Sequence, residues 1–128
     1  MPEFGVVLDT AALLAYTRGS DLVGRYLANI ADRGEHALIP ATCLASAYRD
    51  VDRSGWDLLD VLAGLGHAVI SPLELDDCAV LGSWARTLGL DTAHAAIASA
   101  RHAVIPLMTN KRSLVSTVLV DAWPIVDV

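Results

Sequence analysis

Short apolar runs alternate along this chain with longer segments of mixed polarity. The first run, Val6-Val7-Leu8, is rich in β-branched residues, which favour a buried strand, and the predicted strand ends at Asp9. Helical segments are predicted next at residues 11–17 and 21–33, with Arg18-Gly19-Ser20 between them. Ser20 is a typical N-cap residue, so we expect the second helix to begin directly after it.

The same alternation continues to the end of the chain. Pro40 favours a helix start, because a proline in the first turn loses no needed hydrogen bond. Glycines at 34, 66 and 89 mark helix ends. We expect further strands at residues 37–39, 68–70, 105–108 and 124–126, and further helices at 40–53, 56–65, 73–88, 91–103 and 111–118.

This order of elements predicts an α/β protein. The strands are too short and too far apart along the chain for hairpins, so a mainly parallel sheet with helices on both faces is expected. That arrangement is a three-layer α/β/α sandwich. The sequence contains no internal repeat, low-complexity tract or linker, which predicts a single domain over residues 1–128.

Composition supports a packed domain with an aliphatic core. Hydrophobic residues make up 54% of the 128 residues and aromatic residues only 5%, so close-packed helices on a small sheet are expected. No apolar stretch reaches the roughly 18 residues that span a bilayer. The start, Met1-Pro2-Glu3-Phe4, lacks the basic region of a secretory signal, and we therefore expect a cytoplasmic protein with no membrane partner.

The number of cysteines and the net charge limit which metal sites and which nucleic-acid interactions are expected. Cys43 and Cys78 are too few and too scattered for a disulfide framework or a zinc site, and both are expected to act as small core residues. The formal charge of −6 argues against a broad electrostatic grip on nucleic acid, which needs clustered Lys and Arg. A nuclease that gathers acidic side chains around metal ions stays possible.

Polar side chains occur at several positions that a parallel sheet brings to one edge. Ligands of open α/β sheets bind beyond the carboxyl ends of the strands, where Asp9 stands. On the helix after Pro40, a ridge of polar residues is expected at helical spacing, and on a later helix two residues three apart share a side. The candidates are Asp9-Thr10, the ridge Thr42, Ser46, Arg49 and Arg53, the pair Asp91 and His94, and the strand end Thr109-Asn110-Lys111.

The sequence resembles the PIN domain, and in particular the VapC-like toxins of bacterial toxin–antitoxin pairs. The resemblance covers the whole chain in element order, and its best motifs are Val7-Leu8-Asp9-Thr10 and Asp91-Thr92-Ala93-His94-Ala95-Ala96. It implies a PIN-like fold and an endoribonuclease that acts on RNA with Mg²⁺ or Mn²⁺. It also implies a small homodimer and an antitoxin partner whose tail places basic residues in the acidic cleft.

The acidic set that the resemblance implies is incomplete in this chain. Asp9 matches the first carboxylate and Asp91 the carboxylate that opens the later helix, although a register with Ala93 or His94 at that position is open. Ser46 stands where the family has a glutamate. Lys111, or Asn110 in a shifted register, stands where it has an aspartate.

The resemblance also implies roles for these residues. Asp9 and Asp91 would hold the ion, Thr10 and Thr109 would brace the site, and Lys111 would steady a phosphate. Ser46, His94 and Asn110 would support the site. Two interpretations of Arg49 and Arg53 are open: they are solvated or paired with Asp50, Asp52 or Asp57, or they contact RNA phosphate or a partner.

Other interpretations of the same residues stay open. Asp9 and Asp91 could cap the helices that follow them. Lys111 could pair with Asp9 in place of an ion, and Asp9, Asp91 and His94 could form a site for a softer metal. At the level of the protein, the alternative is a catalytically inactive PIN-like domain that binds protein or RNA. A receiver-like domain with a phosphorylated strand-end Asp fits less well, because the paired acids expected before that strand are missing and its element order differs.

Overall fold

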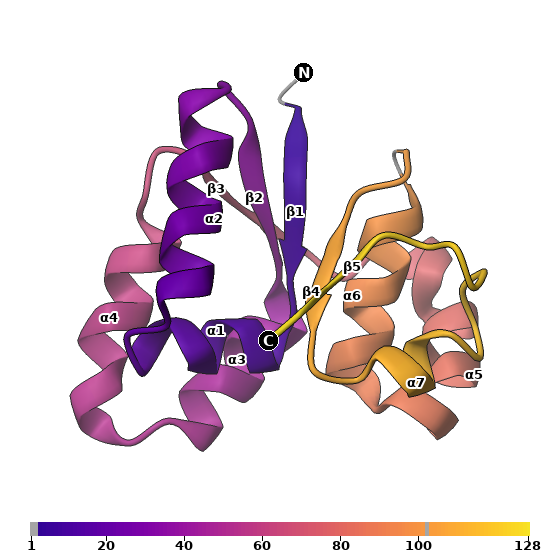
Figure 1. The fold of residues 1–128 in the computed structure, drawn as a ribbon. Coiled ribbons are helices and arrows are strands. Elements are labelled where there is room, and N and C mark those ends of the chain that lie inside the picture. Colours follow the sequence, from indigo (N-terminus) through magenta and orange to yellow (C-terminus); the bar gives the residue numbers. More distant parts are fainter. Residues whose placement is uncertain (1–2, 102) are drawn as a thin grey trace.

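The computed structural model describes residues 3–101 and 103–128 of the chain. Its strands and helices alternate as the apolar pattern predicts (Figure 1). In chain order the elements are β1 (Phe4–Leu8), α1 (Thr10–Thr17), α2 (Asp21–Asp32), β2 (His36–Pro40), α3 (Ala41–Asp50), α4 (Arg53–Ala63), β3 (Ala68–Ser71), the 3₁₀ turn η1 (Leu75–Asp77), α5 (Cys78–Leu88), α6 (Leu90–Arg101), β4 (Leu107–Thr109), α7 (Arg112–Val115) and β5 (Ile125–Asp127).

One sheet of five strands lies at the centre, in the order β3-β2-β1-β4-β5, and every pair is parallel. The first strand of the chain is therefore the middle strand of the sheet, with β2 on one side and β4 on the other. Residues Val6 to Leu8 have no exposed surface, which explains why this strand reads as a continuous apolar run rather than an alternating one.

Helices cover both faces of the sheet, which gives the predicted three-layer α/β/α architecture. Figure 1 shows α2 and α4 on one side of the strands and α5 and α6 on the other. Helix α6 packs against β1 and β2, and α5 packs on α6. The residues from Thr92 to Ser99 of α6 are buried all round, so this helix is alanine-rich because it has neighbours on every side.

Several predicted boundaries need correction. The helix expected over 73–88 starts only at Cys78, because the preceding acidic segment forms a 3₁₀ turn. The strand expected over 105–108 spans Leu107–Thr109, and the helix expected over 111–118 shortens to Arg112–Val115. The helix predicted to reach residue 103 ends at Arg101, and residue 102 lies outside the described residues.

The helix expected over 40–53 ends at Asp50, which changes the predicted ridge. Pro40 is the last residue of β2 and the N-cap of α3, and Val51 leaves the helix with an extended backbone. Asp52 then caps α4, because its Oδ1 accepts a hydrogen bond of 3.2 Å from the amide of Gly55. Arg53 therefore belongs to another helix than the rest of the ridge.

The two cysteines differ in burial, and no membrane-spanning helix is found in the described residues. Cys43 is buried as expected, whereas the prediction that Cys78 is a core residue is wrong, since it lies at the exposed start of α5. Within residues 3–101 and 103–128, no helix combines the length and the apolar character needed to cross a bilayer.

Helix α4 allows a test of the core, because a buried and an exposed apolar residue are adjacent in it. Leu62 is 1% exposed and Val61 is 56% exposed. Leu62→Ala should lower the free energy of unfolding by about 2–5 kcal/mol, because it leaves a cavity in the core. Val61→Ala should change it by less than about 0.5 kcal/mol. Urea denaturation of both variants checks this; equal losses would mean that α4 is not packed as described.

Candidate functional site

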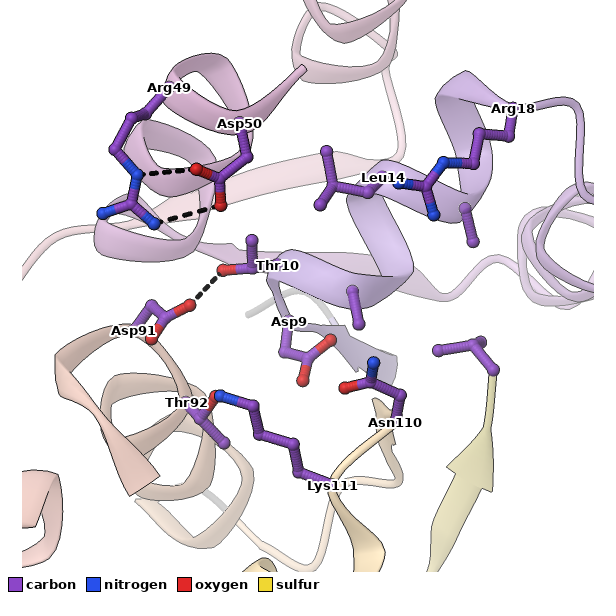
Figure 2. A pocket seen from close by; sticks show the side chains of 13 residues that line it. Asp9, Thr10, Leu14, Arg18, Arg49, Asp50, Asp91, Thr92, Asn110 and Lys111 are labelled. Carbon is purple, nitrogen blue, oxygen red and sulfur yellow. Dashed lines mark hydrogen bonds and ion pairs between the residues drawn. The ribbon is translucent and has the colours of Figure 1, made fainter. Parts of the chain in front are cut away.

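A cleft of about 430 Å³ lies at the carboxyl edge of the sheet, where β1 and β4 end (Figure 2). The start of α1, the end of α3, the start of α6 and the segment after β4 form its walls. This is the position predicted for a ligand site of a parallel sheet. Its lining residues are Asp9, Thr10, Ala11, Leu14, Ala15, Arg18, Arg49, Asp50, Asp91, Thr92, Asn110, Lys111 and Val128.

Asp9 is at once a helix cap and a cleft residue, so both interpretations of it apply. Its Oδ1 accepts a hydrogen bond of 3.0 Å from the amide of Ala12 in the first turn of α1. The carboxylate is only 1% exposed. Burial raises its pKa above the usual 3.8, and the charge of Asp91 adds to this, while hydrogen bonds from Thr109 and Ala12 and the charge of Lys111 oppose it.

Asp91 faces the cleft from the start of α6. Its Oδ2 accepts a hydrogen bond of 2.5 Å from Thr10 Oγ1, which links the first turns of α1 and α6 (Figure 2). Its backbone carbonyl accepts a hydrogen bond of 3.0 Å from Cys43 Sγ. Burial raises the pKa of the Cys43 thiol, which keeps it protonated as a donor. Sequence reasoning missed this role, because a buried cysteine carries no sign of its hydrogen-bond partner.

The strand-end segment after β4 forms the wall beside Asp9. Thr109 is fully buried, and its Oγ1 accepts a hydrogen bond of 3.0 Å from the backbone amide of Lys111. Figure 2 shows the Asn110 amide turned toward Asp9 and the Lys111 side chain extended along the cleft toward Thr92. Lys111 Nζ also lies 3.5 Å from the carbonyl of Leu88. The Thr109 side chain also forms a hydrogen bond with the Asp9 carboxylate, and Lys111 brings a positive charge into the cleft.

Arginines form the opposite rim. Arg49 and Asp50 are neighbours at the end of α3, and two hydrogen bonds of 2.7 and 3.0 Å join them. Arg18 follows α1 and lies four residues beyond Leu14, on the same face of the helix. Sequence reasoning missed Arg18, Leu14 and Asp50 as cleft residues, although the spacing of Thr10, Leu14 and Arg18 signals a common face.

His94 does not reach the cleft, although it follows Asp91 by three residues. It is 3% exposed, and its Nδ1 forms a hydrogen bond of 2.8 Å with Thr42 Oγ1. Burial lowers the pKa of His94, while a hydrogen bond to the carbonyl of Pro72 raises it. The site of Asp9, Asp91 and His94 considered for a softer metal is therefore not brought together.

Ser46 and Arg53 are not among the cleft-lining residues either. Ser46 lies on α3 and is half-buried. The guanidinium carbon of Arg53 lies 5.8 Å from the centre of the Trp56 ring, at the start of α4. Of the predicted ridge, Arg49 alone lines the cleft.

The residues present give a divalent ion a minimal set of ligands. Asp9 and Asp91 offer hard oxygen atoms, and Mg²⁺ can be held by one or two carboxylates if waters and a substrate phosphate complete its shell. Across the described part of the chain, no group of three or more His, Cys, Asp or Glu side chains is placed to hold a metal ion. The cleft thus fits an ion that shares its coordination with a ligand, and it does not form a closed protein cage.

Comparisons with known proteins do not identify a family for this chain, so its likeness to the PIN domain rests on the sequence motifs alone. No family model matches the chain, and no curated protein matches it.

The buried carboxylate predicts a pH dependence of stability. Since the pKa of Asp9 is raised above 3.8 in the folded state, the folded protein binds more protons than the unfolded chain in the interval above that value. Its free energy of unfolding should therefore lose the Asp9 contribution as pH rises through this interval. Asp9→Asn keeps a capping side chain without the charge, so its stability relative to the wild type should increase from about pH 3.8 toward neutrality.

Chemical denaturation at a series of pH values measures this difference. Asp9→Ala is the matched control, and it should be about 1 kcal/mol less stable than Asp9→Asn because it also loses the cap. A difference between Asp9→Asn and the wild type that stays constant with pH would contradict the raised pKa.

Proposed function

We propose that this protein is a PIN-type, metal-dependent endoribonuclease, related to the VapC-like toxins. The observation that supports it most is that Asp9 and Asp91 line one cleft at the carboxyl edge of the sheet. Lys111 lines the same cleft. The two best motifs of the resemblance lie far apart in the sequence, and they meet at this cleft.

In this proposal Asp9 and Asp91 hold one Mg²⁺ or Mn²⁺. The ion, when bound, neutralises charge on the scissile phosphate and generates a nucleophile from water. Thr10 orients the Asp91 carboxylate through its 2.5 Å hydrogen bond, and Thr109 orients Asp9. Lys111 contacts a phosphate oxygen of the substrate as a point charge.

The wider biological setting belongs to the same proposal. A cytoplasmic homodimer that acts on RNA and is held by an antitoxin protein is what the resemblance implies. Arg49 would contact the RNA at the rim, where its guanidinium is exposed despite its bond to Asp50.

A second candidate function is a catalytically inactive PIN-like domain that binds RNA or protein. The charge of the cleft favours it, because the three acids Asp9, Asp50 and Asp91 are matched by Arg18, Arg49 and Lys111. A cleft without net negative charge attracts a divalent cation weakly. Lys111 adds to this, since its positive charge lies in the cleft and would repel a cation bound at Asp9 and Asp91.

Binding of Mn²⁺ separates the two functions. Isothermal titration calorimetry of the wild type should show specific binding, and Asp9→Asn and Asp91→Asn should each abolish it. Asp57→Asn is the matched control, because Asp57 is exposed on α4 and does not line the cleft. RNA cleavage should depend on the same two residues. Absence of Mn²⁺ binding and of cleavage in the wild type would leave the inactive binding domain.

Lys111 provides a test in the opposite direction. Lys111→Asp leaves four acids and two cations in the cleft and should tighten Mn²⁺ binding by about tenfold or more, since about 1.4 kcal/mol of attraction suffices. Arg86→Asp makes the same charge change on the exposed surface of α5 and should have little effect. Equal gains in the two variants would mean that Lys111 acts only through the net charge of the protein.

A further inference from the structure

A second hollow of about 350 Å³ adjoins the cleft. It lies between the end of α1 and the start of α4, and it shares Leu14, Arg18 and Asp50 with the cleft. The two hollows therefore form one groove, which we call the α1–α4 groove. Its remaining lining residues in the second hollow are Thr17, Val51, Asp52, Ser54, Gly55 and Leu58.

Helix α1 gives the groove its direction. Thr10, Leu14 and Arg18 are spaced four residues apart and so follow one face of the helix. From Thr10 to Arg18 the helix rises about 12 Å. A ligand that contacts both Asp9 and Arg18 must therefore be longer than a single phosphate.

Most charged groups of the groove are already engaged within the protein. Asp50 is bonded to Arg49, and Asp52 accepts hydrogen bonds from Ser54 Oγ and from the amide of Gly55. By contrast, Arg18 takes part in no salt bridge with any residue in 3–101 or 103–128. Figure 2 shows its guanidinium turned toward Leu14, at the junction of the two hollows. Lys111 likewise has no carboxylate partner among these residues.

The groove thus presents two cations that form no salt bridge in the described residues, Lys111 at one end and Arg18 at the junction, beside the acids Asp9 and Asp91. Beyond Arg18, the side chains of Leu14, Val51 and Leu58 form an apolar wall. A nucleic acid strand carries phosphates at regular intervals beside flat bases, and single strands bind grooves that combine cations with side chains that contact the faces of the bases. In this groove those side chains are aliphatic.

We propose that the second hollow is a nucleotide subsite, and that Arg18 binds the phosphate between it and the cleft. A single-stranded RNA would lie along α1, with one phosphate at Lys111, the next contact at Arg18, and a base against Leu58. This inference takes its ligand from the proposed function, but it concerns binding rather than cleavage.

The test is binding of a fluorescently labelled single-stranded RNA of eight nucleotides in EDTA, followed by fluorescence anisotropy. Arg18→Ala should weaken binding about tenfold and lower the slope of log affinity against log salt by about one. Arg18→Lys, which keeps the charge, should recover most of the affinity. Arg25→Ala is the matched control on α2, because Arg25 is exposed and lines neither hollow.

A second pair of variants examines the hollow itself. Leu58 and Val61 are both exposed apolar residues of α4, at 41% and 56%, and only Leu58 lines the hollow. Leu58→Asp should weaken RNA binding by about tenfold through repulsion of the strand, and Val61→Asp should not.

The outcomes separate this inference from the proposed function. If Mn²⁺-dependent cleavage fails but Arg18→Ala and Leu58→Asp weaken RNA binding, the subsite stands and the nuclease does not. If RNA binds the wild type and both variants equally, the subsite is wrong, whether or not cleavage occurs. If the wild type binds no RNA in EDTA, the subsite is wrong, and Mn²⁺-dependent cleavage decides the proposed function separately.

Discussion

The cleft depends on a buried carboxylate at the end of the middle strand. Because β1 pairs in parallel with both β2 and β4, the strand is enclosed and Asp9 lies where three strand ends meet. A buried charge is tolerated only where hydrogen bonds compensate it, and the amide of Ala12 and the side chain of Thr109 supply them. Asp9 thus joins the start of α1 to the end of β4. Its position is fixed by the same bonds that make its charge tolerable.

Charge is distributed unevenly in this acidic protein. The chain carries 9 Lys and Arg against 15 Asp and Glu, yet in the cleft three of these nine cations match three acids. Two of them, Arg18 and Lys111, have no carboxylate partner in the described residues. A net negative protein can therefore meet a phosphate ligand at one place, and the repulsion from the rest of its surface is reduced by salt over about 8–10 Å. The net charge argues against a broad nucleic-acid surface but not against a narrow groove.

Local patterns predicted the elements and the two carboxylates, Asp9 and Asp91, that line the cleft. The apolar run before Asp9 and the alanine-rich stretch after Asp91 identify β1 and α6, since burial sets both patterns. The direction of a side chain was harder to predict. His94 shares a helix side with Asp91 by spacing, but packing of α3 against α6 turns it to Thr42. The predicted ridge of polar residues does not reach Arg53, because Asp52 caps a new helix. Arg18 was missed because it lines a hollow together with α4, which is far away in sequence.

The geometry of the cleft is held by contacts that need no metal ion. Asp91 is fixed by the buried helix α6, by the thiol of Cys43 and by the hydroxyl of Thr10, all of which are protein groups. Consequently, the charge of Lys111 sets part of the chemistry of the cleft, while none of these supports of its shape depends on the Lys111 side chain. Fold and chemistry are separable here, as they are in other folds that host several functions. Under the proposed function, the charges of the cleft, rather than the architecture, would decide between cleavage and binding.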